Sequence, residues 1–211
     1  MRCLLTLLLG LAGLAAQAQF GVGVYHNFNE FRVSDLPDGA ERADFPYNNM
    51  SEVAAYYWFR LPKQRIEFQP TVYYAYDFAN DAFDANELGL QFKTNIYVFD
   101  LGTDCHCPTF GKQGPQLQKG LFVQLSPGVA SGHFQGTDRK TVATIGAGLG
   151  LDIGISNLAT LTPLVSYRYT LSSISNQQSS DDGVAFPDAD FRLRTLQLGL
   201  QATFRLDQRN Y

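Results

Sequence analysis

Residues 65–78 read RIEFQPTVYYAYDF, and hydrophobicity in this stretch alternates with a period of two. The more apolar face consists of Ile66, Phe68, Pro70, Val72, Tyr74, Tyr76 and Phe78. The more polar face consists of Arg65, Glu67, Gln69, Thr71, Tyr73, Ala75 and Asp77. Successive side chains of a strand point to opposite faces, so the pattern predicts one long β-strand. Because Pro70 has no N–H to donate to a neighbouring strand, we expect a bulge there.

The same period recurs along most of the chain. It is clear in residues 86–100, 141–154 and 194–206, and weaker in residues 20–28, 52–61, 119–129 and 158–171. Together these stretches predict about eight strands, and no stretch has the pattern of an amphipathic helix. Strands of globular proteins average about five or six residues, whereas a tilted strand that crosses a membrane needs about nine to eleven. The lengths therefore favour membrane-spanning strands.

The connections between these strands alternate in length. Residues 28–51, 77–85, 128–140 and 172–189 are long and polar, whereas 62–64 and 154–157 are short. Long outer loops and short periplasmic turns are typical of outer-membrane barrels, and tyrosines near strand ends fit an aromatic girdle. These tyrosines are Tyr73, Tyr74, Tyr76, Tyr167 and Tyr169. The expected fold is all-β, a single antiparallel up-and-down transmembrane β-barrel.

The first 18 residues are typical of a cleaved signal peptide. Arg2 is followed by an apolar core from Leu4 to Leu14, and residues 16–18 read AQA, a cleavage site of the A-x-A type. We expect cleavage before Gln19, so that residues 19–211 form the barrel domain. Such a peptide implies export, and the barrel pattern then places the protein in the outer membrane of a Gram-negative bacterium.

The net charge of the chain limits the kinds of binding partner that we expect. The formal net charge is −4 at pH 7 and no cluster of basic residues occurs, so nucleic acid is not an expected partner. The expected partner is outer-membrane lipid, with a periplasmic or outer-membrane protein as a further candidate.

The end of the sequence carries a family resemblance. Residues 196–204 read LQLGLQATF, in which apolar residues alternate around a glycine and end at the aromatic Phe204. This ending resembles the C-terminal signal of small outer-membrane β-barrel proteins, the OmpA/OmpX-like group abundant in Bacteroidota. The resemblance implies the barrel fold and the outer membrane, and says little about activity. The chain differs from the pattern in running on to Tyr211.

If the apolar faces point outward, the polar faces fill the barrel interior. A barrel of about eight strands is just wide enough for its own side chains, and buried charges must find partners. We expect ion pairs of Glu67 with Lys93 or Arg65, and of Asp152 with Arg168, in a lumen without an open pore. A narrow solute path is the alternative. The full inward set is Tyr56, Trp58, Arg60, Arg65, Glu67, Gln69, Gln91, Lys93, Asn95, Asp152, Arg168 and Gln201.

Residues 104–108 read DCHCP and lie in a long segment, 101–118, that strand counting places on the periplasmic side. Cys105 and Cys107 are the cysteines that remain after signal cleavage. An oxidising compartment favours a disulfide, although so short a ring is strained. The alternatives are thiols that only shape a turn, a contact surface for a periplasmic partner and, last, a metal site, for which the local ligands are too cramped.

No motif for catalysis or a cofactor stands out. His26 and His133 could act as bases at the barrel rim, but neither belongs to a nucleophile motif. Three non-catalytic roles follow. The protein acts structurally or through its loops, it is an accessory subunit of a secretion or assembly machine that docks through 101–118, or it is a soluble lipocalin-like carrier. A carrier needs the apolar faces inside.

Overall fold

The structure is a computed structural model that describes nine segments of the chain. The expected signal peptide, the segment 101–118, and Cys105 and Cys107 within it, lie outside these segments. The described residues are 19–34, 49–60, 65–77, 86–99, 120–133, 139–156, 159–171, 174–175 and 190–205.

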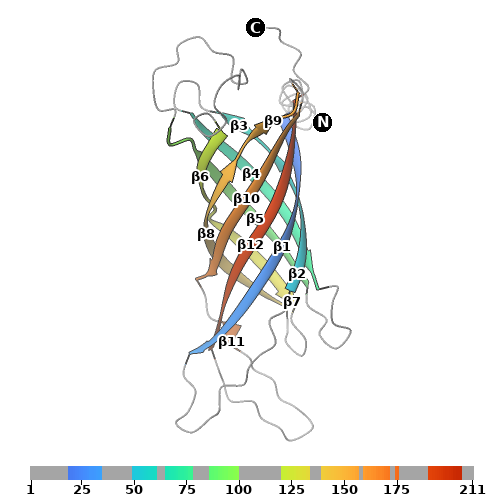
Figure 1. Ribbon diagram of the computed structural model, residues 1–211. Coiled ribbons are helices and arrows are strands. Elements are labelled where there is room, and N and C mark those ends of the chain that lie inside the picture. Colours follow the sequence, from blue (N-terminus) through green and yellow to red (C-terminus); the bar gives the residue numbers. More distant parts are fainter. Residues whose placement is uncertain are drawn as a thin grey trace, which may run out of the picture.

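The described residues fold into one antiparallel sheet that closes into a barrel (Figure 1). The strands are β1 (Gln19–Ser34), β2 (Asn49–Tyr57), β3 (Phe59–Arg60), β4 (Ile66–Tyr76), β5 (Asn86–Ile96), β6 (Leu121–Leu125), β7 (Gly128–His133), β8 (Lys140–Leu151), β9 (Ile153–Gly154), β10 (Ala159–Thr170), β11 (Ile174–Ser175) and β12 (Asp190–Arg205).

Several of these elements are parts of one longer strand. β6 and β7 pair with the same two neighbours, β5 and β8, on either side of Pro127. The short β3, β9 and β11 extend β2, β8 and β10, respectively, and pair with the next strand along the chain. The barrel therefore has eight strands, as the sequence predicts.

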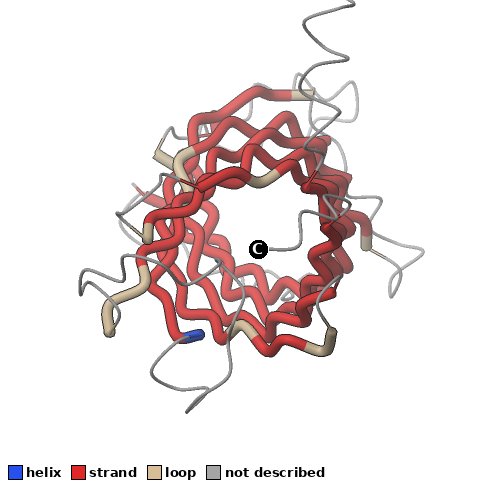
Figure 2. The backbone as a smooth tube through the Cα atoms, turned by 90° about the horizontal axis from the view of Figure 1, so that it is seen from above, coloured by secondary structure: helices blue, strands red, loops and turns tan. Residues whose placement is uncertain are grey.

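Sequential strands are neighbours throughout, and β12 returns to pair with β1. This closing ladder runs from Gln19↔Arg205 to Ser34↔Asp190. Closure leaves no free edge in the body of the sheet, which appears as a ring in Figure 2. We call the end at the Gln19↔Arg205 pair the terminal rim and the end at the Ser34↔Asp190 pair the distal rim.

The bulge expected at Pro70 is wrong. Pro70 pairs with Phe92 in an unbroken register between β4 and β5. On the other side, the pairing with β2 stops at Tyr56↔Thr71 and resumes in the same register at Phe59↔Phe68. The missing N–H of proline is thus accommodated by a gap in one ladder rather than by an extra residue.

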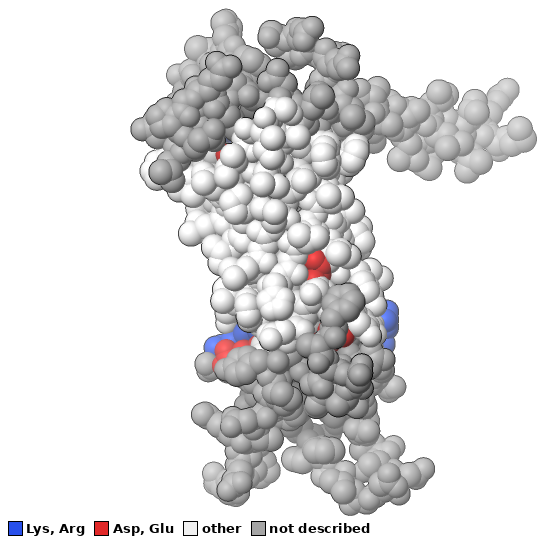
Figure 3. All heavy atoms as spheres, turned by 45° about the vertical axis from the view of Figure 1, so that its right-hand side comes forward, with Lys and Arg blue, Asp and Glu red and all other residues white. Residues whose placement is uncertain are grey.

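The two faces of the sheet have opposite character, and their orientation confirms the sequence prediction. Large apolar side chains such as Val24, Leu90 and Leu149 point outward and are more than half exposed. Polar and charged side chains point inward and are buried, among them Glu52, Lys93 and Gln201. Figure 3 shows one side of this outer surface, over which charged residues are rare except near the distal rim.

Four of the five tyrosines expected at a girdle follow the outward alternation of their strands, Tyr74 and Tyr167 being the most exposed. Tyr73 instead points inward and is 1% exposed. Within the described segments, no helix has the length and apolar character needed to cross a membrane.

Candidate functional site in the barrel lumen

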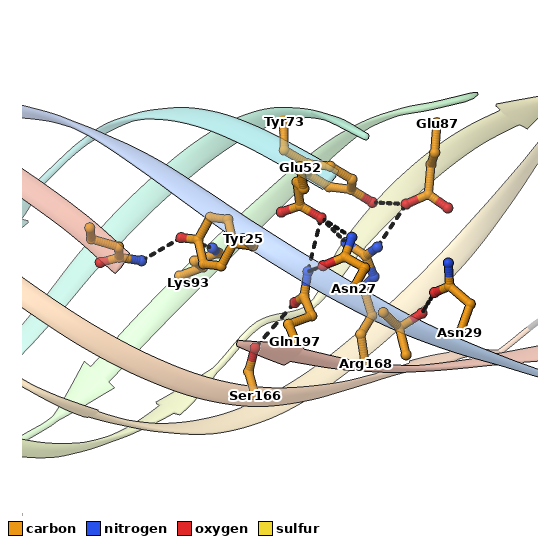
Figure 4. Close-up of polar contacts among 12 residues, drawn as sticks. Tyr25, Asn27, Asn29, Glu52, Tyr73, Glu87, Lys93, Ser166, Arg168 and Gln197 are labelled. Carbon is orange, nitrogen blue, oxygen red and sulfur yellow. Dashed lines mark hydrogen bonds and ion pairs between the residues drawn. The ribbon is translucent and has the colours of Figure 1, made fainter. Parts of the chain in front are cut away.

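Arg168, on β10, is the centre of a charged cluster in the distal half of the lumen (Figure 4). Its Nη1 lies 3.3 Å from Oε2 of Glu52 and its Nη2 lies 3.0 Å from Oε1 of Glu87. The guanidinium carbon is 4.7 Å from the centroid of the Tyr73 ring, and the Tyr73 hydroxyl donates to Glu87 at 2.7 Å. One buried cation is thus held by two carboxylates and an aromatic face.

Amide side chains complete this cluster. Asn27 Nδ2 and Gln197 Nε2 both donate to Oε2 of Glu52 at 2.9 Å. Gln197 Nε2 also contacts Oδ1 of Asn27 at 2.9 Å, and its Oε1 accepts from Ser166 at 3.1 Å. Hydrogen bonds from neutral donors on β1 and β12 thus spread the charge of Glu52, and Ser166 on β10 extends the network through Gln197.

Lys93 occupies a separate position beside Tyr25. Its Nζ donates to the Tyr25 hydroxyl at 3.1 Å and lies 4.6 Å from the ring centroid. The same hydroxyl accepts from Gln201 Nε2 at 2.6 Å. The lysine therefore gains a hydroxyl oxygen and an aromatic face as partners.

A third cluster lies near the terminal rim around Tyr97. The Tyr97 hydroxyl lies 2.8 Å from Oε2 of Glu67 and 2.6 Å from Oδ2 of Asp152. Thr162 donates to the other oxygen of Asp152. Arg65, which is half-buried at the start of β4, has the left-handed backbone conformation, with φ of 48°.

The sequence places these residues in the lumen but predicts some of the wrong partners. Glu67, Lys93, Asp152 and Arg168 are all buried inside the barrel. Arg168 pairs with Glu52 and Glu87, not with Asp152, and the partner of Lys93 is Tyr25, not Glu67.

The reason is the position of each residue along the barrel. Asp152 contacts Thr162, which is six residues before Arg168 on the same strand. At about 3.3 Å per residue, Thr162 and Arg168 are about 20 Å apart along β10, so Asp152 and Arg168 belong to different levels of the lumen. Glu52 and Glu87 occupy inward positions of the same alternating pattern as the predicted residues, so their burial in the lumen was predictable from the sequence. Only their pairing across the lumen needed the structure.

Aromatic rings in the lumen lie against glycines of the neighbouring strand. A Cβ at Gly199 would overlap the ring of Tyr25, and one at Gly89 would overlap the ring of Tyr73. The absence of a side chain at these positions lets each ring lie flat on the backbone, with its hydroxyl directed at the polar clusters.

Several inward amide side chains have atoms without a hydrogen-bond partner in the protein. Both amide atoms of Gln91 are buried without a partner, as are Oε1 of Gln69 and Nδ2 of Asn95. All three lie on β4 or β5, on the side of Tyr73 and Glu87 that faces the terminal rim. Burial of an unpaired polar atom costs free energy, so this part of the lumen contributes less to stability than its polarity suggests.

Metal ligands do not gather in the described lumen. Groups of three or more His, Cys, Asp and Glu side chains placed to hold a metal do not occur in the described segments. His26 lies on the outward face, where its ring packs edge-on against Phe28 with centroids 4.7 Å apart. The side chain of His133 is outside the described part of the structure.

Comparisons with known proteins return structural likenesses only. No protein-family profile and no curated protein sequence matches the chain. Neisserial surface protein A is 12% identical with a TM-score of 0.47, over 88% of this chain and 97% of that one. A major outer membrane protein from Thermus thermophilus is 13% identical with a TM-score of 0.46, over 90% and 99%. Ail, the attachment invasion locus protein of Yersinia pestis, is 11% identical with a TM-score of 0.40, over 89% and 99%.

The class of this protein follows from its own barrel. An eight-stranded closed sheet with an apolar outer surface and a polar interior is a β-barrel built to lie in lipid.

Proposed function

We propose that the chain is an integral outer-membrane protein with a structural, closed lumen, which acts through the surface and loops that it presents rather than through catalysis or transport. The observation that carries this proposal is the polarity of the two faces of the sheet, which is the reverse of that in a water-soluble barrel. Outward side chains are apolar around the barrel, whereas Arg168, Glu52 and Glu87 are paired and buried inside it.

The soluble carrier is disfavoured by the same observation. A carrier of apolar ligands needs apolar side chains inside and polar ones in contact with water. Here the inward side chains of β5, such as Glu87 and Lys93, are charged, and the outward ones, such as Leu88 and Leu90, are apolar and about half exposed.

The proposed closed lumen rests on hydrogen bonds that cross the interior. Arg168 on β10 reaches β2 and β5, and Gln197 on β12 reaches β1 and β2. The Arg168 contacts lie between strands on different sides of the ring, so ions would have to break them to pass. Reconstituted in a planar bilayer, the protein should give no stable conductance steps, and large steady channels would contradict a closed lumen.

Membrane insertion is tested on the full-length protein in its native envelope. We expect the protein to resist extraction with carbonate and to migrate differently on a gel before and after heating, as a stable barrel does. Recovery of a folded soluble monomer without detergent would contradict insertion. Mass determination of the same material tests the expected cleavage before Gln19.

The finer placement among OmpA/OmpX-like proteins is part of the proposal. Its support is the C-terminal pattern 196–204, in which Leu196, Leu198 and Leu200 face outward on β12 and pair with β1 to close the barrel.

A further inference from the structure

The outward face of β12 changes character near the distal rim. Leu200, Leu198 and Leu196 follow one another on this face and are each more than 40% exposed. The next two outward positions toward the rim are Arg194 and Arg192. The strand thus passes directly from an apolar surface to two guanidinium groups.

A tyrosine of the neighbouring strand holds both arginines. Tyr169 on β10 lies opposite Arg194 in the ladder. Its hydroxyl accepts a hydrogen bond from Nη1 of Arg192 at 3.1 Å, and its ring centroid lies 5.9 Å from the guanidinium carbon of Arg194. We call Arg192, Arg194 and Tyr169 the rim cluster.

The rim cluster has unused capacity for an anion. Neither arginine forms an ion pair with a described carboxylate, in contrast to Arg168, which has two. Glu30 stands opposite Arg194 in the register of β1 and is the one acidic neighbour in the adjoining ladder rows with a described side chain. Nε of Arg194 is buried and has no hydrogen-bond partner. Among the described outward side chains of these ladder rows, two cations thus share one carboxylate.

The opposite rim has a different composition. Outward rings there pack against one another, with centroids 5.9 Å apart for Phe20 and Phe204 and 5.3 Å apart for Phe59 and Phe68. Among the described side chains that face outward near the terminal rim, none is a lysine or arginine. Among the described side chains, outward cations thus occur near the distal rim and not near the terminal rim, which points to different surroundings at the two ends.

We propose that the rim cluster binds the phosphate of a lipid headgroup in the outer leaflet. This inference rests on the proposed function, because it needs the apolar belt of β12 to lie in a bilayer. The cluster then sits at headgroup level, where arginine and tyrosine can keep their apolar parts against lipid and their polar parts in the interface. A planar guanidinium donates two parallel hydrogen bonds to a phosphate, which a lone hydroxyl or amide cannot do.

The test compares lipid A carrying two phosphates with dephosphorylated lipid A. Each is titrated into the full-length protein in detergent micelles, and bound lipid is counted by native mass spectrometry. We expect the phosphorylated lipid to be retained preferentially. An Arg192→Gln, Arg194→Gln variant should lose affinity by about thirtyfold, since each arginine contributes to attraction of an anionic headgroup.

Two further variants sharpen the test. Tyr169→Phe removes the hydroxyl that positions Arg192 and should reduce retention less than the double variant. Arg139→Gln is the matched control, because Arg139 is exposed on a different part of the barrel and donates to Asn86 at 2.8 Å. It should leave retention unchanged.

Three results would overturn the inference: equal retention of both lipids, unchanged retention by the double variant, or an equal loss in the Arg139 control. Displacement of the lipid by millimolar inorganic phosphate, together with tight binding of phosphate alone, would also overturn the inference, because the rim cluster would then be a site for a soluble anion. Heat-dependent gel migration is recorded for every variant. If the unaltered protein shows no heat-dependent migration, the barrel proposal fails. If it shows such migration but binds both lipids equally, only the headgroup site fails.

Discussion

The two faces of β5 have opposite character, with apolar side chains outward and charged side chains inward. Leu88, Leu90 and Phe92 point outward and are 46%, 56% and 45% exposed, whereas Glu87 and Lys93 point inward and are 4% and 2% exposed. The outward face needs only to be apolar and makes few specific contacts. The inward face depends on each polar group finding its partner. The two faces should therefore fail in different ways when they are altered.

The largest expected effect is at Arg168. Arg168→Met leaves Glu52 and Glu87 buried without their cation, and loss of one partner of a buried ion pair costs about 3–5 kcal/mol. Urea unfolding in lipid vesicles measures the loss, with the fluorescence of Trp58, the one tryptophan of the chain, as the signal.

A triple variant checks this explanation. Arg168→Met combined with Glu52→Gln and Glu87→Gln removes the stranded charges and should recover most of the lost stability. If the triple variant is less stable than the single one, the contribution of Arg168 is packing rather than charge pairing, and the contrast between the faces is weaker than we infer.

A charge on the outward face should have the next largest effect. Leu200 lies midway along the outward apolar run of β12, and Leu200→Arg should cost about 2–4 kcal/mol, as expected for arginine deep in a bilayer. Asn49→Arg is the control, because Asn49 is exposed near the distal end of β2. Its cost should be below about 1 kcal/mol. Equal costs at the two positions in the same vesicle assay would contradict a lipid-facing surface.

The packing of rings on glycines predicts a smaller steric effect. Gly199→Ala places a methyl group against the ring of Tyr25 and should destabilise the barrel by about 1–3 kcal/mol through overpacking. Gly154→Ala is the matched control, because a Cβ there has no neighbour within 4 Å. Refolding yield and urea midpoints compare the pair, and a similar loss for both would mean that glycine matters through backbone freedom instead.

The smallest effect should come from the unpaired amide of Gln91. Gln91→Met removes two buried polar atoms that have no partner, so stability should change by less than about 1 kcal/mol and should rise if it changes. Gln201→Met removes the hydrogen bond to Tyr25 and should cost about 0.5–1.5 kcal/mol. A larger loss for Gln91 than for Gln201 would show that the inward face does not depend on the contacts described here.

The sequence determined most of the fold because the decisive information is local. Alternation with a period of two sets both the strands and their two faces, and a strand such as Arg65–Phe78 carries this pattern without reference to the rest of the chain. Once the apolar faces must meet lipid, a closed barrel is the remaining solution for a sheet. The burial of Glu67, Lys93, Asp152 and Arg168 followed from the same alternation.

The tertiary structure alone decided which residues meet. The register of each ladder and the tilt of the strands set the height of every side chain in the barrel, and neither is written in the period of a single strand. Arg168 therefore lies level with Glu52 and Glu87 instead of Asp152. The same register brings Tyr169 beside Arg192 and Arg194, so that the candidate headgroup site exists only once β10 and β12 have paired.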